Sequence, residues 1–236
     1  PHADVIYGAL MLCDDKLAPI TRMASHRLDG PNRLHLFFKH NPVPNPGTLT
    51  RLTLFSRVGP FDSTFKHAED YDFWARAASL GATFHFNDHL VCLYRSHPGN
   101  LATAEKAKRA AHERVWVVER FLSRHPVEEI FSHLDWQTQP EQSLFRVCFE
   151  IAELLCRFGG HESAIEALEQ TRGIGNHTEL AALKQLITVA HGGGIEAVEP
   201  LLQQPSMRGE LAQRILSSLL EYHYTETERD AFHIRQ

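Results

Sequence analysis

Charged side chains that could do chemistry gather at two places in the first half of the chain. Glu69, Asp70 and Asp72 stand at the start of a helical pattern. Arg95 and His97 follow where a strand pattern runs into a Pro-Gly turn. Carboxylates can remove protons, a guanidinium fits phosphate oxygens, and a neutral imidazole can bind a metal ion. Together these groups indicate a site for an anionic, metal-bound substrate.

A short helix must position the three carboxylates. The pattern predicts a helix over residues 69–80, with acidic residues in its first turn, where the helix dipole favours anions. Gly81 is a natural residue to follow its end. On this helix Asp70 shares a face with the apolar Trp74 and Ala77, so we expect its carboxylate to point inward.

Other candidate binding residues lie beside the helix pattern and in a stiff loop. Asp72 stands four residues before Arg76, a spacing that favours a surface ion pair. The Pro-rich residues 40–47 cannot form a helix or a central strand. Such a loop often presents groups to a ligand. Asn45 and Thr48 are therefore candidates for substrate contact, and bonding to their own loop backbone is an equally good interpretation.

Several short elements are expected before residue 103. Val5 to Leu12 reads as a buried strand, residues 48–53 as a strand end and residues 54–58 as one helical turn. Residues 82–86 and 90–94 read as two short strands that are joined by a turn. Arg95 and His97 would follow the second of them.

The remainder of the chain reads as helical. Residues 103–124 form one long amphipathic pattern that ends before Pro126. Farther on, Ile165 to Glu169 recurs as Ile195 to Glu199, a spacing of 30 residues. This repeat favours stacked helical hairpins of the tetratricopeptide type, and an irregular helical bundle explains it equally well.

Composition limits the class of protein. The 236 residues carry a net charge of −5, which argues against a dedicated nucleic-acid binder. No apolar run is long enough for a transmembrane segment. The four cysteines form no paired motif, so we expect reduced thiols in a cytoplasmic protein, with peripheral attachment to a membrane left open.

Charge and proline content change near residue 103. Residues 1–103 hold 10 Lys and Arg against 9 Asp and Glu, and the rest hold 14 against 20. Eight of the 12 prolines lie in the first part. This shift predicts two domains, residues 1–103 and 104–236.

An ordered series of motifs in residues 3–101 resembles the C-terminal half of a family 2 glycosyltransferase with the GT-A fold. The acidic motif matches Glu69-Asp70-Tyr71-Asp72-Phe73-Trp74-Ala75-Arg76, and the closing motif matches Leu93-Tyr94-Arg95-Ser96-His97. Three further stretches come earlier in the same order: Ala3-Asp4-Val5-Ile6-Tyr7-Gly8, Asn45-Pro46-Gly47-Thr48-Leu49-Thr50-Arg51 and Val58-Gly59-Pro60-Phe61-Asp62.

This resemblance implies an α/β fold, the acceptor-side half of a nucleotide-diphospho-sugar transferase, followed by an all-α helical-hairpin domain. The parent enzyme would move a sugar from a nucleotide-diphospho-sugar donor to an acceptor hydroxyl with inversion. Asp70 would be the general base, with Glu69 beside it shaping the acceptor site. His97 would help to hold a divalent metal, Mg²⁺ or Mn²⁺, and Arg95 would neutralise the diphosphate. Asn45, Thr48 and Asp72 complete the expected substrate-binding residues.

Two features depart from the family pattern. The glycine loop reads Gly59-Pro60, where the family often has paired glycines. The nucleotide-binding half, with the Asp-x-Asp motif that the metal requires, has no counterpart; Asp14-Asp15 follows the strand that should come after such a motif and reads as a turn. We therefore expect a fragment that is inactive alone.

Two other functions compete with sugar transfer. The helical part could bind a protein partner, with the transferase-like part as a scaffold, and a reading frame that begins at Pro1 would favour this alternative. A metal hydrolase built on Glu69, Asp70 and His97 is disfavoured because the sequence supplies no third ligand at a suitable spacing.

Overall fold

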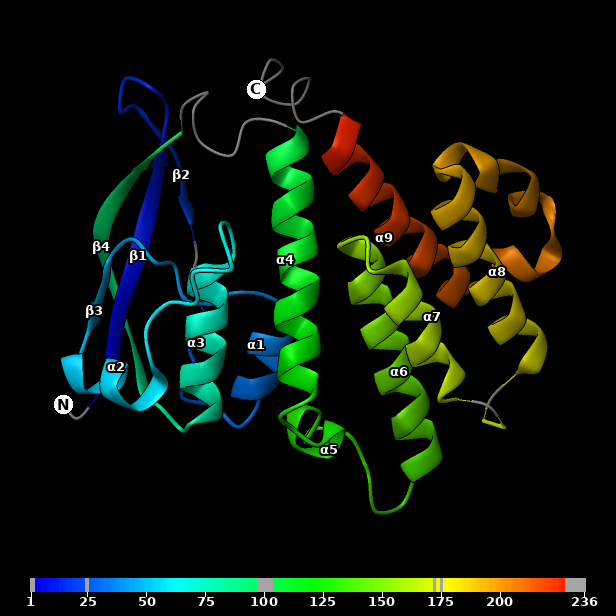
Figure 1. Ribbon diagram of the computed structural model, residues 1–236, viewed down its shortest axis with the longest axis horizontal. Helices are drawn as coiled ribbons and strands as arrows, with labels where there is room; N and C mark the ends of the chain where they lie inside the picture. Colours follow the sequence, from blue (N-terminus) through cyan, green and yellow to red (C-terminus); the bar gives the residue numbers. More distant parts are fainter. Residues whose placement is uncertain (1–2, 24–25, 97–103, 172, 175, 228–236) are drawn as a thin grey trace. The chain divides into compact units, whose positions relative to one another are not determined.

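The computed structural model describes residues 3–23, 26–96, 104–171, 173–174 and 176–227. Their backbone contacts divide into two compact units, each with its own core (Figure 1). The first unit comprises Pro1–Ala102 and Trp116–His133, and the second comprises Thr103–Val115 and Leu134–Gln236. The domain boundary that composition predicts at residue 103 stays a prediction, but residues 116–133 pack with the first unit.

The first unit is built on a small mixed sheet. Its central strand β1 (Val5–Cys13) runs parallel to β4 (Phe84–Arg95). The antiparallel strands β2 (Pro19–Met23) and β3 (Thr48–Thr50) pair with successive parts of β1. Residues Tyr7 to Leu10 of β1 are buried in succession rather than alternately, so both faces of this part of the central strand are covered.

The predicted pair of strands over residues 82–94 is wrong. The segment is one continuous strand, β4, whose register against β1 shifts between Gly8 and Ala9 and again between Ala9 and Leu10. The residues predicted to form a turn lie inside β4 instead. They form a bulge, because β4 has extra residues between those that pair with Gly8 and Ala9 of β1, and pairing continues on both sides.

Short helices cover the sheet of the first unit. They are α1 (Arg33–Lys39), α2 (Leu52–Val58) and α3 (Glu69–Ser79), and α1 and α3 lie together beside the sheet (Figure 1). The α3 prediction is confirmed to within one residue: the helix ends at Ser79, Leu80 is its C-cap residue, and Gly81 then takes a positive φ of 73°. Large apolar side chains fill the space between helices and sheet: Tyr7, Phe37, Phe38, Leu54, Phe73 and Trp74.

One long helix, α4 (Ala104–Leu122), contributes to both units and confirms the pattern over residues 103–124. It is followed by the one-turn helix α5 (Val127–Ile130), which begins after Pro126. From this region Phe131 packs edge-on against Phe38, with ring centroids 5.2 Å apart. The end of the helical region thereby completes the aromatic core of the first unit.

The second unit consists of helices. These are the first part of α4, then α6 (Pro140–Arg157), α7 (His161–Glu169), α8 (His177–Gly193), the 3₁₀ helices η1 (Ile195–Gln203) and η2 (Pro205–Arg208), and α9 (Glu210–Thr227). Helix α6 packs against α7 and α9, and α8 packs against α7 and α9.

The two copies of the 30-residue repeat fold differently. Ile165 to Glu169 forms the end of an α-helix, whereas Ile195 to Glu199 begins a 3₁₀ helix that contains Pro200. Because a proline inside a helix removes an amide donor and crowds the preceding turn, the second copy cannot continue as a regular α-helix. The helical hairpins are therefore not equivalent in conformation.

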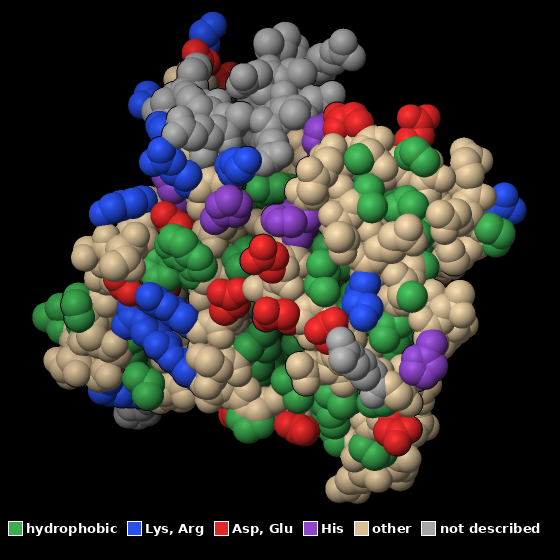
Figure 2. All heavy atoms as spheres, turned by 45° about the vertical axis from the view of Figure 1, so that its right-hand side comes forward, with side chains coloured by type: hydrophobic (Ala, Val, Ile, Leu, Met, Phe, Trp, Pro, Cys, Tyr) green, Lys and Arg blue, Asp and Glu red, His purple; other side chains and the backbone are tan. Residues whose placement is uncertain are grey.

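Surface charge is mixed on the face shown in Figure 2. Acidic side chains gather near the middle of this view, and Lys and Arg side chains lie in separate groups. Among the described residues, no helix has the length and apolar character that crossing a membrane requires. Of the four cysteines, Cys13, Cys148 and Cys156 are buried as free thiols, and burial raises the pKa of Cys148 to about 11.

Candidate active site at the start of helix α3

Asp70 lies half-buried in the first turn of α3, as the inward-facing pattern predicts. Its Oδ1 accepts a hydrogen bond of 2.7 Å from the Tyr71 amide, and the Asn41 side chain also bonds to the carboxylate. Burial raises the pKa of Asp70 above its usual value of 3.8, and the neighbouring Glu69 charge raises it further. Hydrogen bonds from the Tyr71 amide, the Asp70 amide and the Asn41 side chain partly oppose this rise. A carboxylate in these surroundings is a better proton acceptor than one in water.

Glu69 adds a second carboxylate to the same turn. Its Oε2 is shielded from solvent and accepts no hydrogen bond from the described residues. A buried oxygen that lacks a donor is costly, because the water it has lost is not replaced. Glu69 Oε2 therefore keeps unused hydrogen-bonding capacity at the helix start, and it is shielded from solvent in the unliganded structure.

Helix α1 fixes the position of this turn. The hydroxyl of the buried Tyr71 lies 2.6 Å from Phe37 O and 3.1 Å from Phe38 O and donates to the end of α1. Carbonyls in the last turn of a helix lack intrahelical donors, so the phenol satisfies groups that would otherwise be unpaired. Since Tyr71 directly follows Asp70, the bond holds the acidic turn against α1.

Asp72 does not lie on the surface as expected. The predicted pair with Arg76 is present, with Nε 2.7 Å from Oδ2, but the Asp72 side chain is only 2% exposed. The other oxygen lies 3.4 Å from Nη1 of Arg120, which arrives from α4. Two guanidinium groups thus compensate a buried carboxylate. This setting gives Asp72 a structural role and leaves it no open side for substrate.

Arg76 extends this network to the preceding loop. Its two terminal nitrogens donate to Val58 O at 2.6 Å and to Pro60 O at 2.9 Å. Arg120 in turn bonds Oδ2 of Asp62 at 2.8 Å, and this contact depresses the pKa of the Asp62 carboxyl well below its usual range. The loop that resembles the glycine loop is therefore tied to α3 through arginine side chains.

Among the described residues, the other expected binding residues make no contact with the Asp70 carboxylate. The Thr48 hydroxyl donates to Asn45 O at 3.1 Å, so this pair satisfies its own loop, and the Asn45 side chain is exposed. Arg95 is exposed at the end of β4, opposite Cys13. His97 lies outside the described residues. The contacts of Asp70 involve Glu69, Asn41 and Tyr71 instead.

Two residues near the acidic turn were not foreseen. Asn41 belongs to the Pro-rich segment that the sequence identifies as ligand-presenting, so composition pointed to the loop but not to this residue. Arg120 stands 48 residues after Asp72 in a helix with a regular polar pattern. Nothing in the local sequence distinguishes it from the other surface arginines.

A divalent metal finds no ready ligand group in the described residues. No cluster of three or more His, Cys, Asp or Glu side chains with suitable geometry occurs in that part of the chain. The expected ligands were His97, which lies outside the described residues, and the Asp-x-Asp motif of the donor-binding half, which has no counterpart in the sequence. Mg²⁺ or Mn²⁺ binding stays a prediction.

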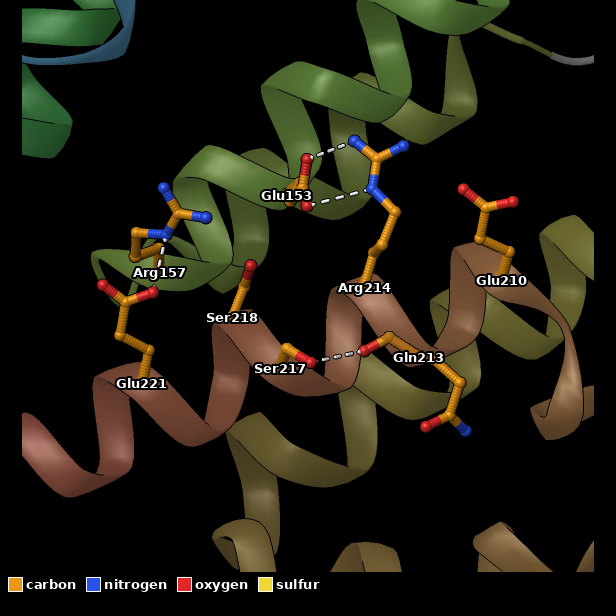
Figure 3. A pocket seen from close by; sticks show the side chains of 8 residues that line it. All are labelled: Glu153, Arg157, Glu210, Gln213, Arg214, Ser217, Ser218 and Glu221. Carbon is orange, nitrogen blue, oxygen red and sulfur yellow. Dashed lines mark hydrogen bonds and ion pairs between the residues drawn. The ribbon is translucent and has the colours of Figure 1, made fainter.

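A pocket of about 230 Å³ lies between α6 and α9 in the second unit (Figure 3). Arg214 pairs with both oxygens of Glu153, at 3.1 and 2.6 Å, and Arg157 pairs with Glu221 at 2.9 Å. These ion pairs connect the two helices across the pocket and largely neutralise its charge. We therefore interpret the pocket as part of the packing contact between α6 and α9.

Comparison with known proteins gives no assignment: no family model, curated protein or solved structure matches the chain.

Proposed function

We propose that residues 3–101 are the acceptor-side half of an inverting glycosyltransferase, with Asp70 as the general base. The observation that carries this proposal is the carboxylate of Asp70, half-buried with a raised pKa in the acidic motif. The ordered motif series gives the reaction class, and the environment of Asp70 suits the chemistry that this class requires.

The chemical step assigned to this chain is proton removal. As the bond between the sugar and the departing diphosphate breaks, the acceptor oxygen attacks the anomeric carbon, and Asp70 takes the proton of that hydroxyl. Glu69 Oε2, which has no donor in the described residues, can accept a hydrogen bond from another acceptor hydroxyl. Tyr71 keeps both carboxylates in place through its bond to α1.

Sugar transfer also needs a donor-binding part, which we propose packs against the sheet of the first unit. Large apolar side chains are exposed on its strands: Ile20 and Met23 on β2, Leu49 on β3, and Leu90, Val91 and Leu93 on β4. Exposed apolar surface of this kind marks an interaction site. Mg²⁺ or Mn²⁺ and the nucleotide-diphospho-sugar would be held mainly by that part, so no step through the metal is assigned to the described residues.

The test uses the protein that the natural reading frame encodes and a panel of nucleotide sugars. Asp70→Asn should lower kcat by about 10²–10⁴-fold, because general-base catalysis contributes that much, and should leave donor affinity unchanged. Asp15→Asn, which changes an exposed carboxylate in a turn, is the matched control and should keep full activity.

Two results would contradict the proposal. Turnover retained by Asp70→Asn would remove Asp70 as the base. A natural reading frame without a donor-binding half would leave the transferase without its nucleotide site and would favour the alternative, a helical module that binds a protein partner.

A further inference from the structure

Two histidines meet in the second unit, away from the acidic turn. His161 begins α7 and His191 lies in the last turn of α8, and their Nδ1 atoms are 3.3 Å apart. The His161 side chain is buried, with 9% of its surface exposed, whereas the His191 side chain is 52% exposed. His161 therefore belongs to the core of the unit, and solvent reaches the pair from the side of His191.

The pairing follows from the internal repeat. Each histidine stands four residues before the repeated segment, His161 before Ile165 and His191 before Ile195. Although the repeated segments differ in helix type, the positions that precede them come together in space. Because the same residue type stands at equivalent positions of two adjacent hairpins, the two imidazoles lie close together.

The distance between the two nitrogens suits a shared metal ion. Zinc binds imidazole nitrogen at about 2.0–2.1 Å in tetrahedral geometry, so two such ligands lie about 3.3–3.4 Å apart. The rings are inclined by 73°, with centroids 5.4 Å apart. A hydrogen bond between two neutral imidazoles has a similar nitrogen separation and is the competing interpretation.

A carboxylate lies near the second ring nitrogen of His191, within ion-pair range but beyond hydrogen-bond distance, and is compatible with a metal ligand. Oε1 of Glu162 lies 3.7 Å from Nε2 of His191, on the far side of that ring from His161. Metal-binding histidines commonly direct their second ring nitrogen at a carboxylate, which leaves the first nitrogen unprotonated and more basic.

The surroundings of His161 shield one side of the pair. The ring of Tyr222 from α9 stands edge-on to His161 at 5.7 Å, and its hydroxyl lies 3.2 Å from Nε2 of His112. Displacement of water from one side strengthens bonds to an ion.

We propose that His161 and His191 form a binding site for a transition-metal ion of the zinc, nickel or copper type. Water would complete the coordination, since the described residues offer no third protein ligand in metal-binding geometry. Imidazole suits these ions, whereas Mg²⁺ prefers oxygen ligands. An ion held by both side chains links α7 to α8 and stabilises the helical unit. This site is independent of the proposed sugar transfer.

Zinc chloride added to metal-free protein tests the site. At a free zinc concentration of about one hundred times Kd, the Tm of the full chain should rise by roughly 5–10 °C. His191→Gln should abolish the rise and remove one equivalent of zinc from an isothermal titration. His177→Gln, an exposed histidine in the first turn of the same helix, is the control and should behave as the unmodified chain.

A nuclear magnetic resonance measurement identifies the atoms involved. Zinc should shift the Nδ1 resonances of both His161 and His191 in ¹⁵N-labelled protein, a result that does not depend on whether a His161 variant folds. An equal rise in Tm for His191→Gln and the unmodified chain, or unshifted Nδ1 resonances, would show that the pair is only a hydrogen bond.

Discussion

Asp70 and Asp72 have opposite environments although they stand two residues apart on α3. Asp70 is half-buried beside another carboxylate, and no guanidinium contacts it in the described structure. Asp72 is fully buried between Arg76 and Arg120. The charges around them therefore leave Asp70 available as a base and tie Asp72 into ion pairs. The sequence of the acidic motif alone does not predict this difference.

Replacement of Asp70 by Asn should stabilise the protein at neutral pH. Because the pKa of Asp70 is raised in the folded state, folding makes its ionisation less favourable, and the unfolded chain binds fewer protons than the folded one as the pH rises above 3.8. Stability is therefore lost as pH rises through this range. Asparagine has no charge to desolvate, so Asp70→Asn should have the higher urea midpoint at pH 7.

The stabilisation should disappear in acid. As the pH falls through the raised pKa of Asp70 and then below 3.8, the carboxyl group becomes protonated and resembles the amide, so the two midpoints should converge. Parallel urea titrations from about pH 3 to pH 7 measure this. A difference that is independent of pH would show that the charge of Asp70 is not the cause.

At the level of elements, the arginine network joins a loop to a helix. Through Arg76, α3 holds the carbonyls of Val58 and Pro60, and through Arg120, α4 holds Asp62 and Asp72. Among the described residues, Asp72 is the one carboxylate that contacts both guanidinium groups. The orientation of the acidic turn relative to the loop therefore depends on a side chain outside the proposed chemistry.

Asp72→Asn should destabilise the chain by about 2–3 kcal/mol. Loss of one partner from a buried ion pair usually costs more, about 3–5 kcal/mol, but Arg120 is 43% exposed and can recover water. Asp88→Asn is the control, since its pair with Arg22 is exposed and should contribute less than about 1 kcal/mol. Equal urea midpoints for the two variants would rule out the anchoring role of Asp72.

Local sequence predicted the helices better than the contacts between them. The starts and ends of α3 and α4 depend on nearby residues such as Gly81 and Pro126, and these predictions are confirmed. The continuity of β4 depends on pairing with β1, far away in sequence, which overrides the local turn preference of Asn87-Asp88. The burial of Asp72 depends on Arg120 in the same way.

The candidate site could be predicted only in part. The position of Asp70 follows from helical periodicity, which is a local property. Asn41 joins it because the end of α1 packs against α3, and no local pattern encodes that contact. The roles of Arg95 and His97 rest on the family resemblance and stay predictions.

At the scale of the whole molecule, each unit has a helix that ends in a left-handed glycine. Gly81 follows α3 in the first unit with φ 73°, and Gly159 follows α6 in the second with φ 80°. Their surroundings differ: an added Cβ at Gly81 meets nothing within 4 Å, whereas at Gly159 it would lie 2.5 Å from the Tyr222 ring. Substitutions at these two glycines therefore distinguish backbone strain, which both positions share, from steric crowding, which only Gly159 has.

Gly81→Ala should cost about 1–2 kcal/mol, the penalty for a side chain in the left-handed conformation. Gly159→Ala should cost about 1–3 kcal/mol more, because the rigid Tyr222 ring must move. Thermal unfolding followed by circular dichroism compares the variants. Similar Tm values would show that α9 yields easily and that the Tyr222 contact is loose.

Because α4 contributes residues to two cores, the site at which the chain is cut decides whether buried side chains keep their partners. A fragment that stops at residue 103 would lack Phe121, Ile130 and Phe131, all buried in the first unit, and would leave their partners facing water. Its complement would carry those same side chains without their core. A chimera that exchanges the helical unit should therefore replace residues 103–115 and 134–236 together, with one junction inside α4 between Val115 and Trp116 and residues 116–133 retained with the first unit.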